Sequence, residues 1–440
     1  MKRIVILTLL LVGVINLKAY DFQIDNLYYT VTNATTFTCA VDEGNEVYEG
    51  EIVIPSTVTY KNKELKVTSI KNSAFRNSNI TSIQLSHNMT MIERFAFYNC
   101  GLLQKVTIPS SVNKIGESSF DNCGSLYSLI IEDGLSELEF DKSSHNPFFS
   151  NSPIEELYLG RNIVAFISTQ YNSLFGDLSN LTKITIGESV ESIPSYCFAG
   201  ASSLRTISLP GNIKIVHNGA FNNCINLKYV EFCDGNTPIK MYHSTIGSHE
   251  YSGGTVNYSI FAQSPIQEVY IGRNFSENSY YYWPQDITFE YLPITKVTIG
   301  KNVSELTSFD GCRDLQSIEI PENVQVIKSF RGCTGLRNVV VHNTNPPTCG
   351  RFSEETYVHG TLFVPSQSIV QYSETTPWSS FWEIKDLSNA SIDFITFDYG
   401  FVGPVYSISG TVLSSNCAYE DLQRLPKGIY IWQNKKFIIR

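Results

Sequence analysis

The cysteines are the residues whose type and spacing most directly suggest chemistry. The 440-residue chain has ten, and five of them recur at one place in a repeated pattern, just ahead of an apolar run: Cys100, Cys123, Cys224, Cys312 and Cys333. Such thiols could act as nucleophiles, form disulfides between neighbouring repeats, or fill a narrow buried slot. Because other repeats have Ser78, Asp177 or Ala201 at this place, we expect buried thiols without a shared catalytic role.

The other candidates for catalysis or metal binding follow no recognisable motif. None of the seven histidines is placed by sequence against a cysteine, and the spacing of His243 and His249 matches no standard metal site. The chain has no H-E-x-x-H, G-x-S-x-G, Walker or G-x-G-x-x-G motif. We therefore expect no catalytic residue, no metal and no cofactor. A local Cys224–Cys233 disulfide and a glycosidase pair of carboxylates stay open.

The elements that carry these residues form a regular repeat. The register L-x-x-V-x-I recurs, mostly every 21 to 28 residues, and starts at Ile80, Leu103, Leu126, Ile154, Leu181, Leu204, Leu227, Ile266, Ile294, Leu315 and Leu336. One such strand cannot bury its apolar face alone, so neighbouring coils must stack. A period in the low twenties is typical of leucine-rich repeats. We predict a β-rich leucine-rich-repeat solenoid, with a parallel sheet on one face, short turns or helical turns on the other, and small β modules at both ends.

The predicted organisation has five parts: a signal peptide (1–19), an N-terminal β-rich cap (20–66), the solenoid (67–345), a C-terminal cap (346–388) and a small C-terminal β module (389–440). Within the solenoid, residues 136–153, 233–265 and 273–291 are expected as insertions that loop out of the stack.

The first residues predict export. Lys2 and Arg3 precede an apolar run, and small residues precede Tyr20, as in a secretory signal peptide. The run is shorter than the ~20 residues that span a bilayer, so we expect no transmembrane segment in the mature chain. The net charge of −10 disfavours nucleic-acid binding, which needs a basic surface. We expect a monomer that is secreted or held on the outer cell surface.

The complete repeat unit resembles a known family. The pattern I-P-x-x-V-x-x-I-G-x-x-x-F-x-x-C recurs in phase, with full copies in 103–123 and 204–224. It resembles the BspA-like leucine-rich repeats, or treponemal type, of Bacteroidales surface proteins, over residues 67–345. The tail, with Gly428 and Tyr430 in a G-x-Y, is similar to a type IX secretion sorting domain; the alternative is a β module without a sorting role. The resemblance implies a non-enzymatic surface protein with a role in adhesion.

The predicted binding residues face outward from the sheet, because they flank the inward residues of each strand. The candidates are Lys105, Tyr158, Lys183, Tyr229, Glu231, Glu268 and Tyr270, together with Tyr281 and Trp283 of an aromatic insertion. A polar face with scattered tyrosines suits contact with a protein or a glycan. A merely solvated face is the alternative for any one residue. For the whole chain, the alternatives are a glycan-active enzyme on the inserted loops and a structural component of a surface assembly.

Overall fold

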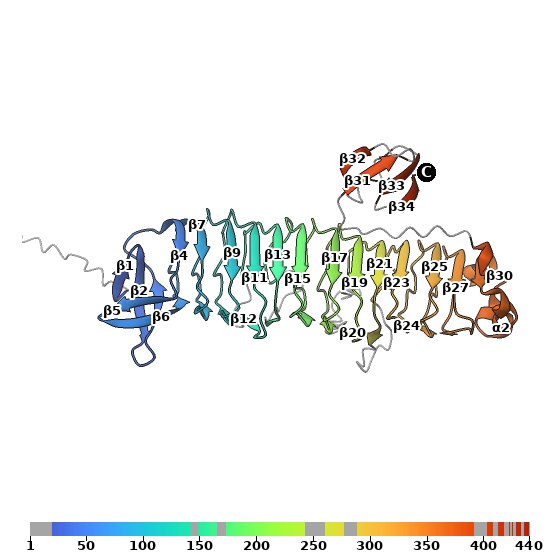
Figure 1. Cartoon of the computed structure of the whole chain (residues 1–440), viewed down its shortest axis with the longest axis horizontal. Helices are drawn as coiled ribbons and strands as arrows, with labels where there is room; N and C mark the ends of the chain where they lie inside the picture. The colour runs from blue at the N-terminus through green and yellow to red at the C-terminus, as the bar shows by residue number, and fades with distance from the viewer. Residues whose placement is uncertain are drawn as a thin grey trace, which may run out of the picture.

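Each sequence repeat folds as one coil, and the coils stack side by side into an elongated solenoid (Figure 1). The computed structural model describes residues 20–141, 148–164, 173–242, 260–276 and 288–390, and short segments between 403 and 439. In β9 (Lys105–Ile108), Val106 and Ile108 are buried while Lys105 is exposed, as the alternation of a half-buried strand requires. The predicted solenoid is confirmed.

The longer strands form one continuous row, whose outward side chains we call the sheet face. Within each sheet of the row, neighbouring strands are parallel and in register, so that equivalent residues of successive coils lie side by side. The row is divided into separate sheets after β7, β15 and β23. Its members besides β9 are β7 (Asn79–Gln84), β11 (Ser128–Ile131), β13 (Glu156–Leu159), β15 (Lys183–Ile186), β17 (Thr206–Leu209), β19 (Tyr229–Phe232), β21 (Glu268–Ile271), β23 (Lys296–Ile299), β25 (Ser317–Ile320), β27 (Asn338–Val341), β29 (Thr361–Val364) and β30 (Glu383–Asp386).

A second row of very short strands runs along the coils and is also parallel. We call its outward side the short-strand face. Its members are β8 (Met91–Ile92), β10 (Lys114–Ile115), β12 (Leu138–Phe140), β14 (Ile163–Val164), β16 (Ser192–Ile193), β18 (Ile215–Val216), β20 (Ile239–Met241), β22 (Phe275–Ser276), β24 (Glu305–Leu306), β26 (Val326–Ile327) and β28 (Thr348–Cys349).

A column of phenylalanine rings, the phenylalanine spine, runs through the return segments of the coils. Neighbouring ring centroids lie between 4.9 and 6.3 Å apart, within the range of favourable aromatic pairs. The members are Phe75, Phe97, Phe120, Phe149, Phe175, Phe198, Phe221, Phe261, Phe289, Phe309, Phe330 and Phe352. Because each ring contacts the next, the spine couples every coil to its neighbours.

Part of each range that was expected to loop out lies inside this stack. Residues 136–153, 233–265 and 273–291 contribute Phe149, Phe261 and Phe289 to the spine, and β12, β20 and β22 to the short-strand row. All three rings are fully buried. Residues 142–147, 243–259 and 277–287 of these ranges lie outside the described residues.

The turn before most of the long strands needs a residue with left-handed backbone. Asn99 and Asn122 adopt φ values of 60° and 59°, and Gly311 and Gly332 adopt 75°. Asparagine tolerates this region and glycine has no Cβ to clash, which explains the Asn-Cys and Gly-Cys pairs of the sequence. The small residue that follows can then point into the core.

Both ends of the stack are closed by aromatic caps. At the N-terminal end, Tyr48 packs on Phe75 with ring centroids 4.6 Å apart. At the C-terminal end, fully buried Trp378 packs on Phe352 and donates from Nε1 to the Pro347 carbonyl at 3.0 Å. The capping elements are β1 (Phe22–Ile24), β2 (Leu27–Asn33), β3 (Thr38–Asp42), β4 (Glu49–Val53), β5 (Thr57–Tyr60), β6 (Lys63–Ile70), α1 (Glu354–His359) and α2 (Ile369–Glu374).

The C-terminal segment contains a separate four-stranded antiparallel sheet, in the order β32-β31-β33-β34. Strands β33 and β34 form an antiparallel hairpin, with partners from Gly428–Ile439 to Trp432–Lys435. The strands are β31 (Gly403–Ser407), β32 (Val412–Cys417), β33 (Gly428–Trp432) and β34 (Lys435–Ile439).

Candidate binding face

The sheet face brings seven of the nine predicted binding residues onto one surface. Because the register is strict, their side chains form two columns that run across the strands. Each is half-buried or exposed: Lys105, Tyr158, Lys183, Tyr229, Glu231, Glu268 and Tyr270. The other two, Tyr281 and Trp283, lie outside the described residues.

Charges on this face lie close to partners of opposite sign or to rings. Glu156 is the cross-strand partner of Lys183, and Glu268 that of Lys296, whose ammonium lies 3.7 Å from the carboxylate. The Lys105 ammonium lies 5.2 Å from the Tyr127 ring centroid, and Tyr127 raises the pKa of this lysine. The face is therefore polar without a block of one sign, which does not favour a highly charged ligand.

Two tyrosines of the sheet face are hydrogen-bonded to aspartates that were not among the predicted binding residues. The Tyr158 hydroxyl donates to Asp133, with oxygen–oxygen distances of 2.9 and 2.8 Å. The Tyr270 hydroxyl donates to Asp234 at 2.8 Å. The Asp133 bond raises the pKa of Tyr158, while burial, followed by Asp234, raises that of Tyr270. Both aspartates are exposed, and each begins an Asp-Gly turn after a strand. The Asp-Gly pair could have identified them from the sequence, but the predicted binding residues were chosen by their alternation within the strands.

A fully buried arginine lies two residues after the end of each of these tyrosine strands. The Arg161 guanidinium donates to the carbonyls of Ser110 and Pro109 at 2.7 and 2.9 Å. Arg273 donates in the same way to Gly211, Ile213 and Pro210, at 2.6 to 2.8 Å. Burial lowers the pKa of both arginines. Each arginine ties its coil to the turn two coils earlier, which fixes the end of the tyrosine strand.

The repeated cysteines, which we call the cysteine ladder, are buried thiols as expected. Each Sγ donates to the carbonyl of a spine phenylalanine in the preceding coil, at 3.0 to 3.3 Å. Two of the serines at this place make the same bond: Ser152 donates to the Phe120 carbonyl at 2.7 Å, and Ser264 to the Phe221 carbonyl at 2.6 Å. Burial raises the pKa of the Cys100 thiol to about 12, far from that of an activated nucleophile. Cys224 and Cys233 are also free thiols.

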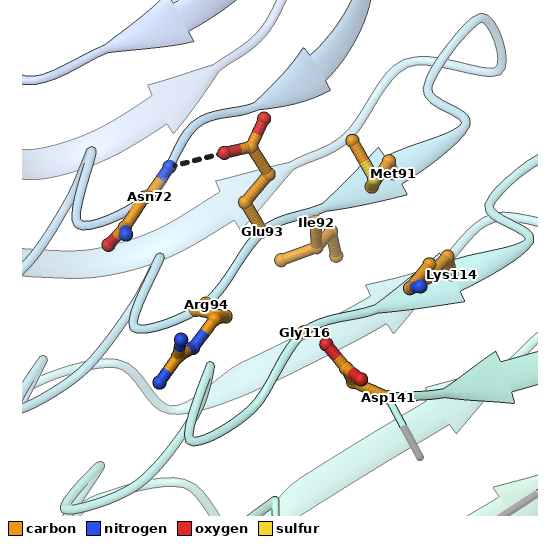
Figure 2. A pocket seen from close by; sticks show the side chains of 8 residues that line it. All are labelled: Asn72, Met91, Ile92, Glu93, Arg94, Lys114, Gly116 and Asp141. Atoms are coloured by element: carbon orange, nitrogen blue, oxygen red, sulfur yellow. Dashed lines mark hydrogen bonds between the residues drawn. The ribbon is translucent and has the colours of Figure 1, made fainter. Parts of the chain in front are cut away.

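A depression on the short-strand face gives no comparable site (Figure 2). It has a volume of about 250 Å³, and three of its charged side chains, Glu93, Arg94 and Lys114, have partners within the protein. Glu93 accepts from the Asn72 backbone at 3.0 Å (Figure 2). Arg94 pairs with Glu117, which is not part of the lining, at 2.6 Å. Its lining consists of Asn72, Met91, Ile92, Glu93, Arg94, Lys114, Gly116 and Asp141.

Within the described part of the chain, no group of three or more His, Cys, Asp or Glu side chains is arranged to hold a metal ion. His243 and His249 lie outside it. The described residues also contain no helix that is long and apolar enough to cross a membrane.

The chain matches one sequence family over most of the solenoid. A family model described as "BspA type Leucine rich repeat region (6 copies)" matches residues 55–173, 146–244, 171–286 and 252–348. No curated protein matches the chain.

Several solved structures of bacterial proteins are similar in fold. A leucine-rich repeat protein from Bacteroides ovatus ATCC 8483 is 22% identical, with 80% of this chain and 96% of that chain covered and a TM-score of 0.38. A leucine rich cell surface protein from Faecalibacterium prausnitzii A2-165 is 19% identical, with 84% and 95% covered and a TM-score of 0.38. The pneumococcal vaccine antigen PcpA is 15% identical, with 83% and 98% covered and a TM-score of 0.28.

Proposed function

Because this chain belongs to the family of BspA-type leucine-rich repeats, we propose that it is a surface protein that binds another macromolecule, a host or microbial protein or glycan, through its sheet face. The single observation that carries the proposal is the register of the long strands. Within each of the sheets β9–β15 and β17–β23 it aligns polar and aromatic side chains of successive coils side by side on one surface. A parallel row of this length offers many weak contacts at once.

The proposals on export, location, domain division and contact residues come from the sequence. We propose export by residues 1–19, a surface location like that of Bacteroidales proteins of this type, and the five-part division given above. Residues 389–440 would act as a sorting module of the type IX kind. The chain would work as a monomer and without catalysis, with Lys105, Tyr158, Lys183, Tyr229, Glu231, Glu268 and Tyr270, and Tyr281 and Trp283 of the insertion, as contact residues.

The test is a binding screen of the chain from residue 20 onward against matrix proteins and glycans. The proposal expects at least one ligand bound above background, and a loss of about tenfold or more in affinity for Tyr229→Ala or Tyr270→Ala, since interface tyrosines often dominate binding. The matched control is Tyr98→Ala, a half-buried tyrosine of a return segment. If no ligand binds, or if Tyr98→Ala is as damaging as the two face variants, the proposal is wrong.

A further inference from the structure

The two middle sheets of the solenoid are copies of one block of four coils. The sheet β9-β11-β13-β15 and the sheet β17-β19-β21-β23 have the same number of strands. The sequence around β13, SPIEELYLGRNI (152–163), has the same residue as that around β21, SPIQEVYIGRNF (264–275), at eight of twelve positions. Strands β15 and β23 follow with KITIG and KVTIG. The two similar coils are four coils apart along the solenoid, so the sequence has a second, longer repeat of four coils in addition to the repeat of the single coil.

The block repeats a site as well as a fold. In both copies a tyrosine of the third strand donates to the aspartate of the Asp-Gly turn after the second strand. In both copies a glycine directly follows the fourth strand and lies against this Tyr–Asp pair. A Cβ on Gly187 would lie 2.5 Å from the Asp133 carboxylate and 2.9 Å from the Tyr158 hydroxyl. At Gly300 the distances to Asp234 and Tyr270 would both be 2.7 Å.

The two glycines therefore leave room for the Tyr–Asp pair at the edge of the sheet face. The carboxylates are exposed and the tyrosines are half-buried, so each pair presents a ring surface beside a carboxylate that can accept further hydrogen bonds. The arginines behind the pairs, Arg161 and Arg273, hold the adjoining strand ends. Such sites are set before a ligand arrives, which lowers the entropic cost of binding.

The chemistry of these pairs favours a neutral, hydroxyl-rich ligand. A carboxylate accepts from hydroxyl groups in charge-assisted bonds, and a ring packs on the apolar C–H side of a sugar. In each block the neighbouring glutamate and lysine are cross-strand partners, Glu156 with Lys183 and Glu268 with Lys296, so these residues add no net charge. Glu188 near Tyr158 and Glu231 near Tyr270 add to the negative charge of the two aspartates, which disfavours an anionic polymer.

We propose that Asp133–Tyr158 and Asp234–Tyr270 are two equivalent subsites for a neutral polysaccharide, both occupied by one polymer. This inference rests on the proposed binding function of the sheet face. The two tyrosine strands are four coils apart, which is about 20 Å at the usual strand spacing and somewhat more here, because β15 and β17 are not hydrogen-bonded to each other. A chain of several sugar units spans that distance, and simultaneous binding at both subsites raises the apparent affinity by about 10²-fold or more.

The experiment uses the chain from residue 20 onward, with immobilised mannan, xylan and β-glucan as probes and short oligosaccharides of the same sugars for calorimetry. The variants are Asp133→Asn, Asp234→Asn and the double change, with Asp314→Asn, an exposed aspartate before β25, as the control. We expect two oligosaccharide sites per wild-type chain and one in each single variant. Polymer affinity should fall about 10²-fold in either single variant, vanish in the double variant and stay unchanged in the control.

Other results would overturn the inference and separate it from the general proposal. One oligosaccharide site per wild-type chain, or no effect of one of the two single changes, contradicts the duplicated subsites. Binding to a basic repeat peptide such as polylysine, but to none of the three polysaccharides, contradicts the glycan class. A protein ligand that is lost with Tyr229→Ala, but not with the double aspartate change, leaves the general proposal standing and removes this one. Thermal unfolding of every variant confirms that the comparison is made on folded chains.

Discussion

At the scale of single residues, the ladder thiols show how one small side chain serves both packing and hydrogen bonding. Cys123 fills a slot between spine rings and donates to the Phe97 carbonyl at 3.2 Å. Ser152 makes the equivalent bond in the next coil. The requirement at this place is therefore a small side chain, and a hydroxyl can replace the thiol as the donor. In another coil Ala201 fills the place without a side-chain donor.

Changing Cys123 tests that requirement. Cys123→Ser keeps a donor and should lower the free energy of unfolding by about 1 kcal/mol or less, while Cys123→Val removes the donor and crowds the slot, costing about 1–3 kcal/mol. Urea unfolding measures both, and ligand binding should be unchanged in each folded variant. A serine variant as unstable as the valine variant would show that the hydrogen bond is unimportant.

The ladder also predicts sensitivity to alkali. Burial raises the pKa of Cys100, Cys224 and Cys333 from 9.0 to about 12. Above pH 9 the unfolded chain releases these protons while the folded chain retains them, so stability is full below pH 9 and is lost as the pH rises toward 12. Each thiol contributes a slope of about 1.4 kcal/mol per pH unit in that window. Unfolding at several alkaline pH values should therefore give a shallower slope for Cys100→Ser than for wild type; equal slopes would contradict the assignment.

At the scale of elements, the sequence predicted the long strands better than the return paths. The L-x-x-V-x-I alternation places the strands because the period of two fixes which residues face inward. Phe149 was expected in an insertion because the ladder was recognised by its cysteines, whereas the coil has Phe149-x-x-Ser152. Asp133 and Asp234 lie beyond the strands, where alternation carries no information, and only the stacking of the next coil brings each beside a tyrosine.

Phe149→Ala tests whether this segment belongs to the stack. Removal of a fully buried spine ring should cost about 3–5 kcal/mol, as for Phe120→Ala in the coil before it. The control is Leu135→Ala, which removes a fully exposed side chain and should change stability by about 0.5 kcal/mol or less. Denaturant unfolding measures the free energy of unfolding of the three variants relative to wild type. A Phe149→Ala effect as small as that of Leu135→Ala would mean that the segment loops out.

At the scale of the whole molecule, the phenylalanine spine and the two aromatic caps hold the coils in one register, and that register makes the sheet face. If the sheet face were only solvated and bound no ligand, substitutions on it would affect binding no more than substitutions on the short-strand face. The central claim is therefore a difference between two faces of one solenoid, and it can be measured with equal numbers of the same substitution on each.

The most direct measurement is the dissociation constant of the ligand found in the screen for two double variants. Lys105→Ala with Lys183→Ala changes the sheet face, and Lys114→Ala with Lys240→Ala changes the short-strand face, in β10 and β20. The account predicts that the sheet-face pair weakens binding about tenfold or more, while the short-strand pair changes it by less than about twofold. Equal losses from both pairs, or a loss from the short-strand pair alone, would contradict it.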